Sequence, residues 1–138
     1  MDIDARGPRF GAAVTTVVLA VVLVTSSAWL LAWQTLAFAL GAAGGVVRSP
    51  YGWLFRKAVR PRLGPPTGFE APEPPRFAQA VGLVFVGLGL VGYTLGPEWL
   101  GLAATGAALA AAFLNAVFGY CLGCEMYLLV RRMTVRAE

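Results

Sequence analysis

The chain has 138 residues, enough for one domain, and a formal net charge of +4. Hydrophobic residues make up 58% of it and charged residues only 13%, against about 25% in soluble globular proteins. A water-soluble fold of this size is excluded because too few polar side chains exist to cover its surface, and lipid is the expected surroundings. The chain has no histidine, which removes the commonest general base and metal ligand. The sequence has no run of basic residues interleaved with aromatic residues, so it gives no indication of nucleic-acid binding.

Four apolar segments follow one another along the chain. No charged residue occurs from Phe10 to Val47, which is too long a run for one helix, since about 20 residues cross the hydrocarbon core. The polar triplet Thr25-Ser26-Ser27 divides this run into two spans. Gly96-Pro97-Glu98 ends a third span and precedes a fourth. The expected spans are residues 10–26, 28–47 and 77–95, and a fourth that begins at Trp99.

The basic residues all lie on one side of these expected spans. The loops at 25–27 and 96–98 carry none of them. The positive-inside rule therefore predicts a bacterial inner-membrane protein with both termini in the cytoplasm. A cleaved signal peptide is not expected, because no small-residue cleavage site followed by a polar sequence is present. The basic residues are Arg6, Arg9, Arg48, Arg56, Lys57, Arg60, Arg62, Arg76, Arg131, Arg132 and Arg136.

The two halves of the chain share a sequence pattern. Residues 8–14 (PRFGAAV) resemble residues 75–81 (PRFAQAV) without a gap, and Trp29-Leu30 matches Trp99-Leu100. We expect a duplicated helical hairpin related by a pseudo-two-fold axis along the membrane normal. The alternative is that every helix entry favours an arginine and an aromatic residue. The expected organisation is a single four-helix transmembrane domain over 1–138, with repeat one at about 6–60, a linker at 61–76 and repeat two at about 75–132.

The loop after the second span predicts a short amphipathic helix in the plane of the membrane surface. Ser49-Pro50 is a favourable helix start. Arg56, Lys57 and Arg60 form a basic face that would bind anionic lipid or an acidic partner. The alternative is a simple extension of the second span. The proline-rich segment 61–76 is expected to be an extended tether without a fold of its own. The apolar face comprises Tyr51, Leu54, Phe55, Ala58 and Val59.

Cys121 and Cys124 are the only cysteines and stand at C-x-x-C spacing. On a helix, residues three apart share a face, and inside a cell such a pair indicates a redox or metal site more than a structural disulfide. The alternative is that both merely pack as small apolar residues. Two thiolates are half of a tetrahedral zinc site, so a four-cysteine site would need a homo-oligomer. No bound metal and no cofactor are predicted.

The position of the pair depends on whether the fourth helix breaks. If Gly119 or Gly123 breaks it, a new helix begins near Cys124 at the cytoplasmic interface, and its positive end favours a thiolate. If the helix is unbroken and tilted, the sulfurs lie about 10–15 Å deep. Glu125 favours the break, since a carboxylate in hydrocarbon is costly. Glu125 and Asn115 are possible modulators of the pair.

Several sequence blocks resemble the bacterial, mainly actinobacterial, domain-of-unknown-function family 4395. They cover nearly the whole chain, and the last is the most specific. The resemblance implies a small integral membrane protein, often encoded beside thioredoxin-like and rhodanese-type sulfurtransferase proteins. The blocks are residues 6–10 (RGPRF), 48–52 (RSPYG), 60–66 (RPRLGPP), 75–79 (PRFAQ) and 113–125 (FLNAVFGYCLGCE).

Three functions follow from these expectations. The first is exchange of electrons or sulfane sulfur between the Cys121–Cys124 pair and a cytoplasmic thioredoxin-like or rhodanese-type partner. The second is transport of a small sulfur compound past the cysteines. The third is a structural or assembly subunit without catalysis. Whether the protein is an enzyme is left open by the sequence.

Overall fold

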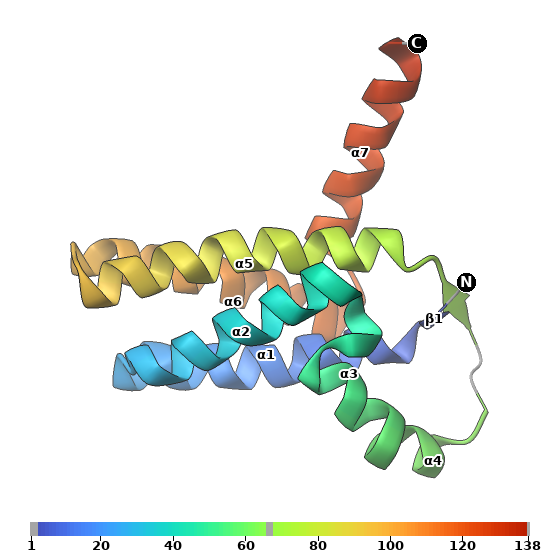
Figure 1. Ribbon diagram of the computed structural model, residues 1–138, viewed down its shortest axis with the longest axis horizontal. Helices are drawn as coiled ribbons and strands as arrows, with labels where there is room; N and C mark the ends of the chain where they lie inside the picture. Colours follow the sequence, from blue (N-terminus) through green and yellow to red (C-terminus); the bar gives the residue numbers. More distant parts are fainter. Residues whose placement is uncertain (1–2, 66–67, 138) are drawn as a thin grey trace.

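The structure, a computed structural model, describes residues 3–65 and 68–137 and is almost entirely helical (Figure 1). Its four longest bundle helices are α1 (Arg6–Thr25), α2 (Ala28–Gly44), α5 (Glu73–Thr94) and α6 (Glu98–Phe118). A final helix, α7 (Leu122–Ala137), leaves the bundle steeply. The shorter elements are β1 (Ile3–Asp4), η1 (Val46–Arg48), α3 (Pro50–Leu54), the π-helical turn η2 (Phe55–Val59), α4 (Arg60–Leu63) and β2 (Phe69–Glu70).

Three of the bundle helices, α1, α5 and α6, are long and apolar enough to cross a membrane. Helix α2 is also apolar but has 17 residues. It ends at Gly44, three residues before the expected boundary, because Gly45 has a φ of +90° and η1 follows. Large apolar side chains such as Val17, Leu36 and Val84 are exposed on the outside of the bundle, which suits lipid and not water.

The core of the bundle is apolar with a few buried polar groups. Leu19, Leu31 and Val86 are fully buried at its centre. Helices α5 and α6 approach so closely that a Cβ on Gly92 would collide with the backbone of Gly101. Close approach through small residues compensates for the missing hydrophobic force between helices in lipid.

Two arginines join the halves of the bundle. Arg9 on α1 donates to the carbonyl oxygens of Ala116 and Val117 at the end of α6, at 3.2 and 3.1 Å. Arg76 on α5 donates in the same way to Ala42 and Ala43 at the end of α2, at 2.7 and 2.6 Å. Each guanidinium thus satisfies helix-end carbonyls that have no partner within their own helix.

The segment after α2 is helical, but its apolar face differs from the expected one. The hydroxyl of Ser49 accepts from the N–H of Gly52 at 3.0 Å, and Pro50 occupies the first turn, so the predicted helix start is confirmed. Tyr51 and Phe55 are buried, whereas Leu54 and Ala58 are exposed. The π-helical turn η2 interrupts the regular α-helix that the predicted apolar face assumed, since it changes the number of residues per turn.

The proline-rich segment has more structure than the predicted tether. Helix α4 includes Pro61, and α5 starts at Glu73 with Pro74 and Pro75 in its first turn, where proline needs no N–H partner. Between them β2 pairs antiparallel with β1, in the register Ile3 opposite Glu70 and Asp4 opposite Phe69. The expectation of a segment without a fold of its own is therefore wrong.

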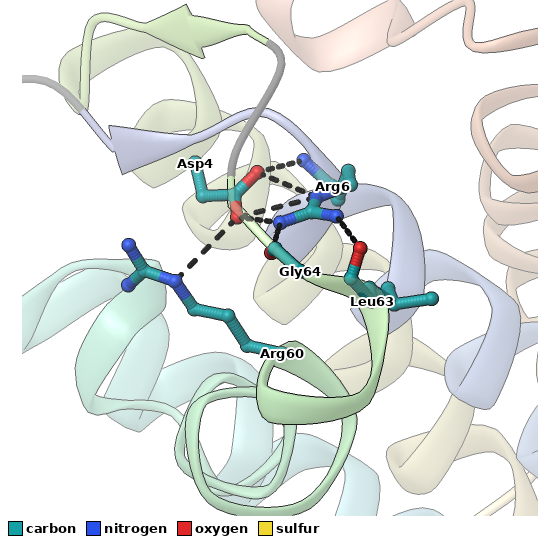
Figure 2. Close-up of polar contacts among 5 residues, drawn as sticks. All are labelled: Asp4, Arg6, Arg60, Leu63 and Gly64. Carbon is teal, nitrogen blue, oxygen red and sulfur yellow. Dashed lines mark hydrogen bonds and ion pairs between the residues drawn. The ribbon is translucent and has the colours of Figure 1, made fainter.

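An ion pair connects the N-terminal strand to the first residue of α4 (Figure 2). The Asp4 carboxylate accepts from Arg6 at 2.9 Å and lies 3.8 Å from Arg60. Arg6 also donates to the carbonyl oxygen of Gly64 at 3.1 Å. Its hydrogen bonds to Asp4 hold the pKa of that carboxyl below its usual value. The contact joins segments almost sixty residues apart in sequence.

Candidate functional site

The fourth long helix breaks at Gly119. Its last helical residue is Phe118, and Gly119 adopts a left-handed conformation with φ of +68°, which glycine adopts at little cost. The Arg9 guanidinium lies close to this glycine and donates hydrogen bonds to the carbonyl oxygens of Ala116 and Val117 before it. The chain therefore turns here, and the alternative of a single long tilted helix is wrong.

The two cysteines lie at the start of α7. Helix α7 begins at Leu122, two residues earlier than the predicted position near Cys124. Cys121 occupies the N-cap position, where its sulfur accepts from the N–H of Cys124 at 3.1 Å and its carbonyl accepts from Glu125 at 3.0 Å. The two cysteines form a disulfide, with their Cα atoms 5.2 Å apart. Both are only partly exposed.

The first turn of α7 packs tightly on α5. A Cβ on Gly123 would lie 2.5 Å from the Cβ of Ala78, so the backbones approach more closely than any side chain at 123 allows. One turn further on, the rings of Tyr127 and Phe77 lie 5.7 Å apart. Glycine between the cysteines thus fixes the disulfide against the bundle, while Glu125 on the other side of the turn is exposed.

A cavity of about 300 Å³ extends from Cys121 into the bundle between α1, α5 and α6. Its wall is mainly apolar, and its polar side chains are Asn115, Gln79 and Thr15. Sequence reasoning singled out Asn115 and missed Gln79 and Thr15. The signal was available, because a polar residue inside an apolar span is costly and often functional. Four alanines of α6 contribute to the wall: Ala107, Ala108, Ala111 and Ala112.

The predicted basic residues lie apart from the cysteines. Arg56 and Lys57 are exposed on η2, and Arg56 donates to the carbonyl of Val47 at 2.8 Å. Arg60 faces Asp4, as described above. The segment that bears them and α7 leave the bundle in opposite directions (Figure 1). The structure therefore brings together the cysteines, Asn115 and the neighbouring Glu125, but not the basic group.

The fold and the site define a small all-α protein with membrane-type helices and a disulfide at the start of a helix beside an apolar cavity. The sequence model described as "Domain of unknown function (DUF4395)" matches residues 3–132. The chain belongs to this family, which confirms the resemblance noted from the sequence blocks. No curated protein and no solved structure is significantly similar to the chain.

Proposed function

We propose that Cys121 and Cys124 form a redox pair that exchanges electrons, or a sulfane sulfur, with a cytoplasmic thioredoxin-like or rhodanese-type protein. The observation that carries the proposal is the place of Cys121 at the N-cap of α7, bonded to Cys124. When the pair is reduced, the N–H groups of the first turn favour a thiolate at Cys121, because the helix N-terminus is positive.

The exchange with a disulfide partner proceeds in two displacements. The Cys121 thiolate attacks one sulfur of the partner's disulfide, and the other partner sulfur leaves as a thiolate that takes up a proton. The Cys124 thiolate then attacks the Cys121 sulfur and closes the disulfide seen in the structure. The partner's second sulfur leaves as a thiolate. Two electrons pass from the pair to the partner, and the reverse sequence reduces the pair.

A persulfide partner would use the same two cysteines. The Cys121 thiolate attacks the terminal sulfur of the partner's persulfide, and the partner's own thiolate leaves. Cys124 then attacks the inner sulfur of the Cys121 persulfide, so that a hydrosulfide ion leaves and the disulfide forms. The 5.2 Å between the two Cα atoms lies within the range that disulfide geometry requires.

The proposal includes four membrane spans with both termini in the cytoplasm. Helix α2 is about 25 Å long at ~1.5 Å per residue, close to the ~30 Å of hydrocarbon. The start of α1, helices α3 and α4 and the start of α5 lie at one end of the bundle (Figure 1), and these segments carry basic residues. By the positive-inside rule this end faces the cytoplasm of a bacterial inner membrane, where α7 would lie along the membrane surface.

The proposal also includes the duplicated hairpin, which three pairs of contacts support. Arg9 reaches the end of α6 as Arg76 reaches the end of α2. The Phe10–Phe55 ring pair has the same 5.7 Å separation as Phe77–Tyr127. Ser49 caps α3 through the N–H of Gly52, three residues on, and Cys121 caps α7 through that of Cys124.

Trapping of the mixed disulfide tests the exchange. A Cys124→Ser variant cannot complete the second displacement, so it should accumulate a covalent complex with a cytoplasmic partner after rapid alkylation. The matched control is Cys121→Ser, which lacks the attacking sulfur and should trap none. Mass spectrometry of the complex identifies the partner. If neither variant traps a protein, the exchange proposal is wrong.

The transport alternative receives less support from the cavity. A sulfur oxyanion would have to leave water for a mainly apolar wall, at a high cost in free energy. Exchange at the membrane surface requires no such transfer.

A further inference from the structure

We propose that the cavity beside Cys121 binds the ring of a lipid-soluble quinone, which accepts the two electrons of the reduced cysteine pair. The inference rests on the proposed dithiol function and adds the electron acceptor. The quinone would be a diffusible co-substrate that enters from the bilayer, not a group held permanently by the protein.

The cavity has the size and wall that such a ring requires. Apolar cavities of about 150 Å³ accept benzene, so about 300 Å³ has room for a substituted ring. The cavity is lined by Pro8 near the start of α1 and by Thr15 further along it, a depth of about 10 Å at ~1.5 Å per residue. Small alanine side chains of α6 form one wall, and a flat ring fits against such a surface.

Thr15 offers a hydrogen-bond donor deep in this cavity. It is only 3% exposed, and its oxygen accepts from the side-chain N–H of Gln34 at 3.3 Å. In the described part of the chain its hydroxyl makes no bond to the carbonyl four residues earlier, so its hydrogen is available to a ligand. Five other threonines do make that bond: Thr16, Thr25, Thr35, Thr94 and Thr134.

A buried hydrogen-bond chain fixes the direction of this donor. The Tyr51 hydroxyl donates to the side-chain oxygen of Gln34 at 2.6 Å, so the Gln34 amide nitrogen must face Thr15. Burial raises the pKa of the Tyr51 phenol, which keeps it protonated and able to donate. Because the Gln34 amide donates to the Thr15 oxygen, the Thr15 hydroxyl cannot donate to Gln34, and its hydrogen is left for another acceptor.

Gln79 and Asn115 supply two further polar groups. Both line the cavity, and among residues 3–65 and 68–137 neither side-chain amide has a hydrogen-bond partner. Both residues are partly buried, and an amide costs free energy where apolar groups replace water without a hydrogen-bond partner. A neutral ring with carbonyl oxygens would accept hydrogen bonds from such groups, whereas a lipid acyl chain would leave both amides unpaired and the Thr15 hydrogen unused.

The chemistry balances without another reactant. Each of Cys121 and Cys124 loses its S–H hydrogen, and a bond forms between the two sulfurs. The two hydrogens amount to two electrons and two protons. The quinone takes them up, so that its two carbonyl oxygens become hydroxyl groups, and it leaves as a quinol. Cys121 lines the cavity, so a bound ring would lie beside this residue. The chain has only two cysteines, so the electrons have no second pair to reach within it.

The test uses the full-length protein, reduced in lipid nanodiscs, with decylubiquinone as the probe. Its ring is fully substituted, so a thiol cannot add to it. Loss of the quinone's ultraviolet absorbance and closure of the Cys121–Cys124 disulfide are followed together. Ala111→Phe fills the cavity, and its neighbour Ala110→Phe is the control, since Ala110 is exposed and does not line the cavity.

We expect Ala111→Phe to slow both signals by about tenfold or more relative to the wild type, while Ala110→Phe leaves them unchanged. Thr15→Val should slow them and Thr15→Ser should restore them, which controls for a folding defect in Ala111→Phe. Equal rates in all variants, or no reaction of the wild type with decylubiquinone, overturn the quinone site. Partner trapping by Cys124→Ser needs no quinone, so its outcome separates failure of this site from failure of the exchange itself.

Discussion

At the scale of single residues, the disulfide depends on glycines as much as on cysteines. Gly119 permits the turn that ends α6, and Gly123 lets the first turn of α7 lie against Ala78. The sequence left open whether one of these glycines breaks the helix, with Glu125 favouring a break, and the structure shows the break at Gly119. The separate role of Gly123 depends on a tertiary contact with α5, which no local pattern encodes.

Substitution of Gly123 by alanine should displace α7 from the bundle. The added Cβ would lie 2.5 Å from the Cβ of Ala78, and overpacking of this kind typically costs about 1–3 kcal/mol. We expect a lower melting temperature in detergent and faster reduction of the disulfide by dithiothreitol. Gly106→Ala is the control, because a Cβ there meets no atom within 4 Å and alanine favours a helix interior. Equal behaviour of the two variants would contradict the packing argument.

At the scale of helices, the arginines that join the halves act on helices other than their own. Arg9→Gln removes the charged partner of Ala116 and Val117 at the end of α6. A charged hydrogen bond contributes about 1.5 kcal/mol at the low end of its range, appropriate here because the group is exposed. We expect amide hydrogen exchange to rise by about tenfold around Gly119.

Arg76→Gln is the reciprocal control for that prediction. It should raise exchange at the end of α2, near Ala42 and Ala43, and leave Gly119 unchanged. If either substitution affects both helix ends equally, the arginines act through general stability and not through the carbonyls they contact.

The Asp4 contact makes the joined strands and α4 sensitive to acid. Arg6 lowers the pKa of Asp4 in the folded protein, so the stabilisation is complete above the unfolded value of about 3.9. It is lost as the pH falls through the lower folded value. We expect the melting temperatures of the wild type and Asp4→Asn to differ at pH 7 and to approach one another as the pH falls below about 4. A difference that persists in acid would exclude Asp4 as the source.

The sequence predicted the helices well and their contacts poorly. Runs without charge and the triplet at 25–27 predicted α1, α2, α5 and α6 with boundaries correct to within a few residues, because long apolar runs bounded by polar or turn-forming residues indicate helices of this kind. The π-helical turn at Phe55–Val59 and the pairing of β1 with β2 depend on tertiary packing and were missed. For the site, C-x-x-C spacing identified the cysteines. Gln79 and Thr15 stand out in the sequence as polar residues inside apolar spans, but their position beside Cys121 depends on which helices meet.

At the scale of the whole molecule, the proposed topology predicts which surface each residue faces. In a background without cysteines, Ser26→Cys in the turn between α1 and α2 should react with a membrane-impermeant maleimide in spheroplasts. Lys57→Cys on η2 should react only after the membrane is opened. Both side chains are exposed, so access and not burial decides the result. The opposite pattern would reverse the assigned orientation.

The hydrogen bonds from Arg9 on α1 to the end of α6, and from Arg76 on α5 to the end of α2, have a consequence for assembly. In each hairpin, carbonyl oxygens at the end of the second helix accept hydrogen bonds from the arginine of the other hairpin. Each hairpin by itself would leave these carbonyls without that partner. The covalent link through residues 64–72 would then be dispensable once both parts are inserted. Separate synthesis of residues 1–66 and 67–138 in one cell should reconstitute the protein, whereas either fragment by itself should be degraded.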